Sequence, residues 1–360
     1  MRLSMPIRSG LTACATLALL AGGALAQASF VDHRGKTITF DSPPERVVTI
    51  VRSAPILYRA VDGTADHVAG MNRDSLTRYF TSGLLAELLP EMADIPASAA
   101  QDGFVPNVEA ILEQQPDAVI QWIYDPEIIE PLERVGLTVV GWDCCTEQHR
   151  LDYVTLTGYM TGRNDRAQQI LGLQAEALDG LRDKLADVDA GAWPSVLHVD
   201  QLGDQIRVIA NGSQDLSLSG VTNPAADDSN EWWRTIDLEQ LLVWDPDMIV
   251  IPAYATELTP QDFLDDPVLG SLKAVAAGKV YKQPVFARTP DAPEIYLTSA
   301  WLAALAHGAD FAPAFREAVT GAYGVIYGVD MSDAQVDAAL ETEANAGAAG
   351  YDALFGPAGE

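Results

Sequence analysis

The chain has 360 residues, and its 22 basic and 51 acidic side chains give a formal net charge of −29 at pH 7. Such a charge repels phosphate groups and argues against nucleic acid as a partner. With 48% hydrophobic residues, the sequence is that of a globular protein with one large domain or two smaller ones.

Residues 1–26 have the pattern of a secretory signal peptide. Arg2 and Arg8 precede a short apolar run that ends in Ala24-Leu25-Ala26, a small-residue cleavage site. The run is too short to span a membrane. Leu11-Thr12-Ala13-Cys14 also resembles a lipoprotein box, but such a box needs its apolar run before the cysteine, and here the run follows it. We therefore expect cleavage after Ala26 and a location in a bacterial periplasm.

Residues 27–150 alternate between strand and helix signals and predict a first α/β lobe with a parallel sheet. A helix is predicted over Asn107–Gln115, between two prolines. The strands are predicted from short, largely β-branched runs. They are Val47–Val51, His67–Met71, Ala118–Trp122 and Leu137–Trp142.

Residues 151–188 carry no strand signal, and apolar positions at helical spacing predict one long helix, although Gly158, Gly162 and Gly172 weaken it. Residues 189–360 then predict a second α/β lobe, in which Asp237–Val243, Tyr296–His307 and the tail from Ser332 are helical. Its strands are expected at Ser195–Val199, Gln205–Ile209, Met248–Ile251 and Lys279–Gln283.

The two lobes share a pattern. Asn107–Ile120 (NVEAILEQQPDAVI) and Asp237–Val250 (DLEQLLVWDPDMIV) both contain a helix, then Pro-Asp, then a buried strand. Two further stretches stand out without sharing this pattern. They are FVDHRGKTITFDSPPERVVTI near the mature N-terminus and GKVYKQPVF followed by SAWLAALAHG.

In these four stretches and their order, the sequence resembles the periplasmic substrate-binding proteins of ABC importers for iron complexes, haem and cobalamin. The resemblance implies two Rossmann-like lobes with parallel sheets, joined by a single long α-helix, with a ligand cleft between the lobes. Ligands also favour domain interfaces and the carboxyl ends of parallel strands on general grounds.

Eleven residues at the carboxyl ends of predicted strands or in nearby loops are candidates for ligand binding. Guanidinium groups pair with the oxygens of anionic chelates, and aromatic rings cover or stack on them. The alternatives are surface ion pairs for the arginines and core packing for Trp122. The candidates are Arg52, Arg73, Trp122, Tyr124, Cys144, Cys145, Trp232, Trp233, Arg234, Tyr254 and Arg288.

The adjacent Cys144 and Cys145 lie in a loop that we expect at the rim of the cleft. The sequence leaves three states open for them: a disulfide that stiffens one turn, two free thiols, or two soft metal ligands joined by His149. A disulfide between neighbours is unusual, because their Cα atoms lie about 3.8 Å apart and disulfides prefer about 4.4–6.8 Å.

The resemblance further implies docking on a permease through one acidic residue in each lobe. By motif position these are Glu239 and either Glu127 or Glu130, which are otherwise ordinary surface acids. We expect a monomer that binds an iron(III)–siderophore or a similar metal chelate, delivers it to an ABC permease and its ATPase, and has no cofactor of its own.

The alternatives are a binding protein for haem, cobalamin or a nickel chelate, and a periplasmic metallochaperone or thiol-dependent enzyme that uses Cys144, Cys145 and His149. The sequence contains no G-x-S-x-G, H-E-x-x-H or phosphate-binding loop, so we expect no catalysis.

Overall fold

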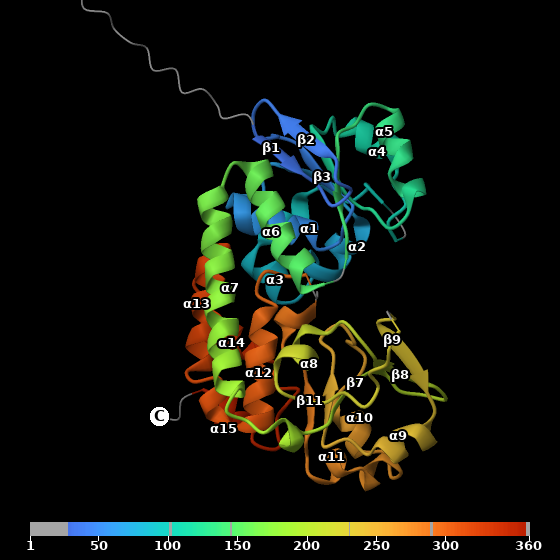
Figure 1. Ribbon diagram of the computed structural model, residues 1–360, viewed down its shortest axis with the longest axis vertical. Coiled ribbons are helices and arrows are strands. Elements are labelled where there is room, and N and C mark those ends of the chain that lie inside the picture. Colours follow the sequence, from blue (N-terminus) through green and yellow to red (C-terminus); the bar gives the residue numbers. More distant parts are fainter. Residues whose placement is uncertain (1–27, 101–102, 145, 230, 289–290, 358–360) are drawn as a thin grey trace, which may run out of the picture.

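The computed structural model describes residues 28–357 except 101–102, 145, 230 and 289–290. The expected leader and Cys145 lie outside these residues. Two α/β lobes lie one above the other and are joined along one side by a group of helices (Figure 1). This confirms the predicted fold class.

The first lobe is built on a four-stranded parallel sheet in the order β4-β3-β5-β6. Nearly all of its strand residues are buried, as expected for a parallel sheet with helices on both faces. A small antiparallel hairpin precedes this sheet. The strands are β1 (Ala28–Val31), β2 (Thr37–Phe40), β3 (Val47–Thr49), β4 (Val68–Met71), β5 (Ala118–Trp122) and β6 (Val139–Trp142).

The connections of the first lobe are short helices. They are α1 (Ala54–Asp62), α2 (Arg73–Ser75), the π-helical η1 (Leu76–Phe80), α3 (Leu84–Leu88), η2 (Pro90–Asp94), α4 (Val108–Glu113), η3 (Pro126–Ile128) and α5 (Glu130–Arg134).

The second lobe has a five-stranded sheet in the order β11-β10-β7-β8-β9. The first three of these strands are parallel, but β8 and β9 are antiparallel, so the sheet is mixed and not wholly parallel as predicted. The reason is local: residues 202–205 are too short a link to cross over between parallel strands. The strands are β7 (Val196–Gln201), β8 (Ile206–Ile209), β9 (Trp233–Ile236), β10 (Met248–Ile251) and β11 (Val280–Lys282).

Helices cover both faces of this second sheet. They are η4 (Ala190–Ala192), α8 (Gln214–Leu218), α9 (Leu238–Trp244), α10 (Pro260–Leu264), η5 (Leu269–Ser271), α11 (Lys273–Ala276), η6 (Val285–Arg288), α12 (Tyr296–His307) and η7 (Ala309–Phe311). One face forms a separate buried cluster with α9 and α11, and the other joins the core that continues into the first lobe.

The segment that the sequence predicts as one helix over 151–188 is two helices, α6 (Glu147–Thr161) and α7 (Asn164–Leu185). They separate at Gly162, whose φ of 69° is left-handed and ends α6. A capping box formed by Thr146 and His149 starts α6 earlier than expected. The 22-residue α7 is therefore the long helix that connects the lobes (Figure 1).

After α12 the chain runs back to the first lobe in α13 (Phe315–Tyr327) and α14 (Asp333–Ala339). The last described helix, α15 (Tyr351–Phe355), lies beside the second lobe and packs on α12 (Figure 1). Helix α13 packs against both α1 and α7. Arg166 of α7 donates to the carbonyls of Ala60 at 3.3 Å and Ile326 at 3.0 Å, which joins all three helices. None of the described helices is both long and apolar enough to cross a membrane.

Candidate functional site

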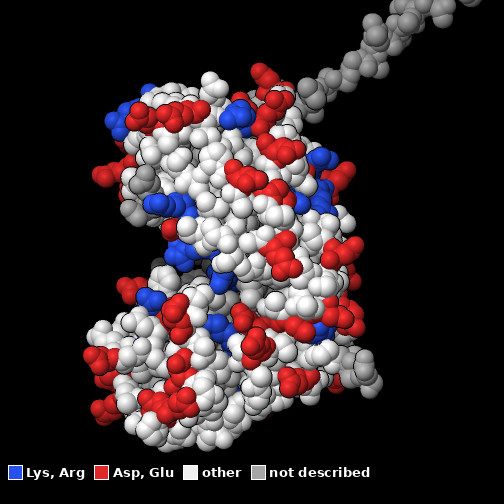
Figure 2. Space-filling view, turned by 180° about the vertical axis from the view of Figure 1, so that it is seen from behind, with Lys and Arg blue, Asp and Glu red and all other residues white. Residues whose placement is uncertain are grey.

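A hollow separates the two lobes, and Lys and Arg side chains gather around it although the outer surface is mainly acidic (Figure 2). The carboxyl ends of β3, β5 and β6 of the first lobe and of β7 and β10 of the second lead into the loops considered below. In parallel sheets this edge is where ligands bind.

In the first lobe, an arginine and three aromatic rings form one cluster near the carboxyl ends of β3 and β5. The Arg52 guanidinium lies 4.8 Å from the centre of the Phe104 ring. The rings of Trp122 and Tyr124 lie 6.0 and 6.3 Å from that of Phe104. Trp122 is buried, whereas the Tyr124 side chain is 62% exposed and is available to a ligand.

Arg52 also forms an ion pair with Asp74, at 3.6 Å between Nη1 and Oδ2. Burial raises the pKa of Tyr124, as does Asp125, while Arg52 opposes this increase. Arg73 is the first residue of α2, whose N-terminus is capped by the Asn72 side chain, and its own side chain is exposed. The structure thus brings Arg52, Trp122 and Tyr124 together around Phe104, and Arg73 lies outside their contacts.

In the second lobe, Trp232, Trp233 and Tyr254 come together. Trp233 Nε1 donates to Tyr254 Oη at 3.3 Å, and this hydroxyl donates to Asp200 Oδ2 at 3.2 Å. Asp200 Oδ1 accepts from Arg207 Nε at 2.8 Å, and the Arg207 guanidinium lies 5.6 Å from the Trp233 ring centre. The Trp232 ring packs edge-on against Trp233 at 6.2 Å.

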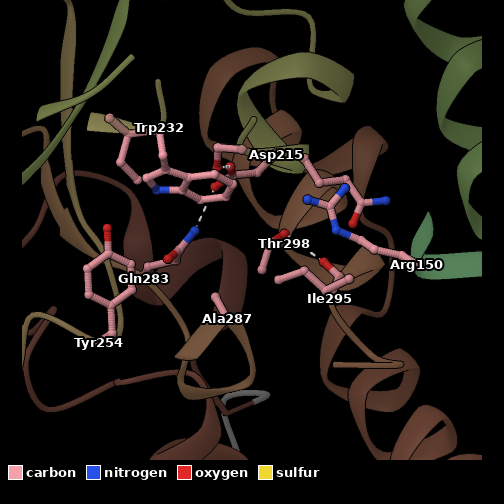
Figure 3. A pocket seen from close by; sticks show the side chains of 11 residues that line it. Arg150, Asp215, Trp232, Tyr254, Gln283, Ala287, Ile295 and Thr298 are labelled. Atoms are coloured by element: carbon pink, nitrogen blue, oxygen red, sulfur yellow. Dashed lines mark hydrogen bonds between the residues drawn. The ribbon is translucent and has the colours of Figure 1, made fainter. Parts of the chain in front are cut away.

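Trp232 and Tyr254 also line a small pocket between the lobes, which Figure 3 shows with Arg150 reaching in from the opposite side. Gln283 Nε2 donates to Asp215 Oδ2 at 2.7 Å inside it. The enclosed space is about 30 Å³, enough for a water molecule and too small for a chelate. This pocket therefore forms part of the floor of the cleft.

The floor is completed by four polar residues, Ser53, Arg150, Gln214 and Asp291, which we call the floor cluster. Arg150 is buried in the first turn of α6, and its Nη2 donates to the carbonyl of Gly212 in the second lobe at 3.2 Å. Ser53 Oγ donates to Asp291 Oδ2 at 3.1 Å. Gln214 is buried, and its Oε1 has no hydrogen-bond partner among the described residues. Both lobes thus supply polar groups to the floor.

Gly212 is constrained by its neighbours. Its φ is 83°, which favours glycine, and the Trp232 ring lies 2.7 Å from where a Cβ would be. Any larger residue here would displace the indole that lines the cleft.

His198 lies beneath this region, fully buried on β7, with its Nε2 3.4 Å from Asp215 Oδ2. Burial lowers the pKa of His198, and Asp215 opposes this decrease. Asp215 is held by further donors, the hydroxyl of Ser213 and the backbone N–H of Leu216.

Two predicted arginines lie away from these clusters. Arg234 alternates with Trp233 along β9 and so faces the α9 side, where its guanidinium is 5.7 Å from the Trp244 ring and 3.9 Å from Asp227. Arg288 donates from Nη1 to the carbonyl of Arg78 at 3.1 Å, in a groove beside α14.

Cys144 is exposed and disulfide-bonded, and its expected partner Cys145 lies outside the described residues. Its backbone N–H donates to Asp143 Oδ1 at 2.9 Å. His149 Nε2 lies 3.9 Å from Asp143 Oδ2, and the rings of His149 and His33 are 5.1 Å apart. Within the described part of the chain, no group of three or more His, Cys, Asp or Glu side chains is placed to hold a metal ion.

The acids suggested for docking are all exposed. Glu127 lies in η3, and Glu130 begins α5, where Arg134 pairs with it at 4.0 Å. Glu239 lies in the first turn of α9, in an open groove that also contains Val243.

The two repeat helices α4 and α9 match in detail. The Asn107 side chain caps α4 by accepting from Ala110 at 3.3 Å, as Asp237 caps α9 by accepting from Gln240 at 2.8 Å. Both helices also end at a residue with positive φ that is not glycine, 49° at Gln115 and 41° at Asp245. The counterpart of Glu239 is therefore Glu109, which is exposed in the first turn of α4.

The family model described as periplasmic binding protein matches residues 99–284, just over half of the chain. The chain belongs to this family. No curated protein sequence matches it.

Solved structures of such binding proteins share the fold of this one. A periplasmic solute-binding protein from Veillonella parvula is 21% identical, with a TM-score of 0.77 over 89% of this chain and 99% of that one. CeuE of Helicobacter pylori in a Ni-His complex is 19% identical, with a TM-score of 0.68 over 87% and 98%. MolA of Haemophilus influenzae bound to molybdate is 18% identical, with a TM-score of 0.71 over 84% and 99%.

Several residues of the candidate site could not be predicted from the sequence. Arg207 lies within β8, Arg150 within α6 and Asp291 in a connection, so none directly follows a buried strand. The only available signal is for Phe104, an aromatic residue in a loop just before α4.

Proposed function

We propose that this protein captures an iron(III)–siderophore or a similar metal chelate in the cleft and delivers it to an ABC permease. It would be exported to the periplasm through a signal peptide cleaved after Ala26 and would perform no chemistry of its own. Periplasmic binding proteins of ABC importers work with a permease and its ATPase, which supports a role in solute import through such a transporter.

The observation that carries the proposal is that each lobe supplies an arginine stacked on an aromatic ring near the cleft. These pairs are Arg52 on Phe104, at 4.8 Å, and Arg207 on Trp233, at 5.6 Å. Tyr124 and Trp232 widen the two aromatic surfaces. Aromatic faces suit the apolar exterior of a chelate, and guanidinium groups suit its oxygen atoms.

Haem, cobalamin and a nickel chelate remain alternatives with the same requirements. The Ni-His complex of CeuE and the molybdate of MolA support a metal-containing ligand for this fold and leave its kind open. Of the residues predicted from the sequence, the ligand contacts in this proposal are Arg52, Tyr124, Trp232, Trp233 and Tyr254, while the buried Trp122 supports the Phe104 ring. Arg73 and the loop of Cys144 and Cys145 would contact only a ligand that extends to the rim.

For delivery, we propose that Glu239 and its repeat counterpart Glu109 meet basic residues of the permease. Both lie one turn from a capped helix start, and both are exposed. Exposed apolar side chains accompany them, Leu112 on α4 and Val243 on α9. The two lobes would thus present similar surfaces to the permease.

The proposal is tested by titrating the mature protein with five separate ligands and following tryptophan fluorescence. The ligands are ferric hydroxamate, ferric catecholate, haem, cobalamin and bare metal ions. Saturable quenching by one chelate at micromolar concentration or below supports it. Tight binding of a bare ion with no response to any chelate contradicts it and favours a metallochaperone that uses Cys144, Cys145 and His149.

Trp232 provides a sharper readout. We expect Trp232→Phe to lose most of the quenching and to weaken binding about tenfold, which is about 1.4 kcal/mol. Trp244→Phe is the matched control, because Trp244 packs on Arg234 on the opposite face of the sheet. Equal losses of quenching in both variants would show that the cleft is not the site.

A further inference from the structure

Asp291 reaches across the floor of the cleft. It precedes α12 of the second lobe, and its Oδ2 accepts from Ser53 Oγ, 3.1 Å away in the first lobe. Ser53 directly follows Arg52. Asp291 and the buried Arg150 line the same small cavity. A carboxylate of the second lobe therefore bonds to the residue next to Arg52 of the first lobe and lines a cavity with Arg150 of α6.

The electrostatics agree with this placement. Burial raises the pKa of Asp291, and Arg150, the hydrogen bond from Ser53 and Arg52 all oppose this increase. Guanidinium groups near a carboxyl favour its charged form, which then acts as their counter-ion.

Ion pairs with aspartates also hold the arginines of the two aromatic clusters. Arg52 pairs with Asp74 at 3.6 Å, and Arg207 with Asp200 at 2.8 Å. Asp74 and Asp200 thus pair with Arg52 and Arg207, and Asp291 lines one cavity with Arg150. Although Arg and Lys side chains surround the hollow (Figure 2), this part of the cleft carries little net positive charge for a ligand.

We propose that Asp291 sets the charge of the chelate that the cleft accepts, an inference that rests on the function proposed above. Together with Asp74, it offsets the charges of Arg52 and Arg150 and so selects a chelate of low net charge over a polyanion. A ferric tris-hydroxamate is neutral, because three singly charged groups balance Fe³⁺, whereas a ferric tris-catecholate carries three negative charges. A trianion that entered the floor would meet the Asp291 carboxylate, and this repulsion supplies the discrimination.

The test compares the Kd of a neutral ferric tris-hydroxamate with that of a trianionic ferric tris-catecholate. It uses the full-length mature protein and Asp291→Asn, which keeps the shape and a hydrogen-bonding oxygen but removes the charge. In the variant we expect affinity for the trianion to rise at least about tenfold and affinity for the neutral chelate to stay within about threefold.

Two further variants isolate the cause. Asp183→Asn removes the same charge from an exposed position on α7 and should change neither Kd. Ser53→Ala keeps the Asp291 carboxylate but removes its hydrogen bond, and should keep the preference for the neutral chelate.

Three results would overturn the inference. They are an unchanged ratio of the two Kd values in Asp291→Asn, the same shift in Asp183→Asn, or an equal shift in Ser53→Ala, which would indicate geometry and not charge. If no chelate binds to any variant or to the unaltered protein, the proposed function itself fails, and this inference fails with it.

Discussion

Glu294 is a buried carboxyl group just before α12, with its side chain enclosed by tyrosines. Tyr327 Oη donates to it at 2.6 Å and Tyr323 Oη at 3.5 Å. Tyr296 and Arg59 are the other titratable groups that interact with this cluster. Burial raises the pKa of Glu294 from 4.5 to about 7, and the hydrogen bonds from the tyrosines only partly oppose it.

This pKa predicts a pH dependence of stability. Because the folded pKa is above the ordinary value, the contribution of Glu294 to stability is complete below about pH 4.5 and is lost as pH rises through about 7. The loss is on the order of 3 kcal/mol. We expect Glu294→Gln to flatten the fall in the free energy of unfolding between pH 5 and pH 8, measured by urea denaturation. Glu317→Gln, exposed on α13, should keep the slope of the unaltered protein.

At the cleft, the rule that ligand residues follow parallel strands selects Arg52, Tyr124 and Tyr254, which lie beside other residues of the cleft. It fails for Arg234, because neighbouring residues of β9 point to opposite faces of the sheet and Trp233 takes the cleft side. It also cannot find Arg150 and Asp291, which meet only when the helices joining the lobes pack together.

Among the elements, buried strands and long apolar helices are the most predictable. Ala118–Trp122, Met248–Ile251 and Tyr296–His307 have the predicted bounds, because a run buried on all sides needs no knowledge of its partners. The break between α6 and α7 was not predicted, since its cause is the backbone conformation of Gly162 and the packing of the two helices on each other.

Two glycines of these helices should respond oppositely to substitution. A Cβ at Gly158 would lie 2.6 Å from Ala167 Cβ, so Gly158→Ala forces α6 and α7 apart and should destabilise the protein by about 1–3 kcal/mol. Gly172 is exposed in α7 with nothing within 4 Å of such a Cβ, and Gly172→Ala should stabilise it by about 0.5–1 kcal/mol.

The measurement is the midpoint of thermal unfolding of each variant. Equal destabilisation by both substitutions would contradict the close packing of α6 on α7.

On the scale of the whole molecule, the sequence has 51 acidic and 22 basic side chains, and Figure 2 shows many acids on the outer surface of the face that it draws. Many acids are therefore exposed, and docking residues cannot be recognised by charge alone. The repeat of α4 and α9 distinguishes Glu109 and Glu239 from the rest because it gives each lobe the same acid at the same helical position.

We expect the double variant Glu109→Ala, Glu239→Ala to bind the chelate as before but to lose stimulation of the permease ATPase in liposomes. Removing two charges that meet basic groups of a partner weakens the encounter without touching the cleft. The matched control is Glu127→Ala with Glu130→Ala. Loss of stimulation in the control and not in the first variant would reassign docking in the first lobe to η3 and α5.

The return of α13 to the first lobe has a consequence for how the protein is made. Arg59 of α1 donates to the carbonyl of Tyr327 at 3.3 Å, and Gln335 of α14 donates to Glu87 at 2.6 Å. The half that leaves the ribosome first thus gains its last helical neighbours only when the final part has been synthesised. Such distant pairings close slowly and leave apolar surface uncovered for longer. A chain cut after α12 would therefore lose the contacts of α13 and α14 with the first lobe, and the first lobe would be prone to aggregate.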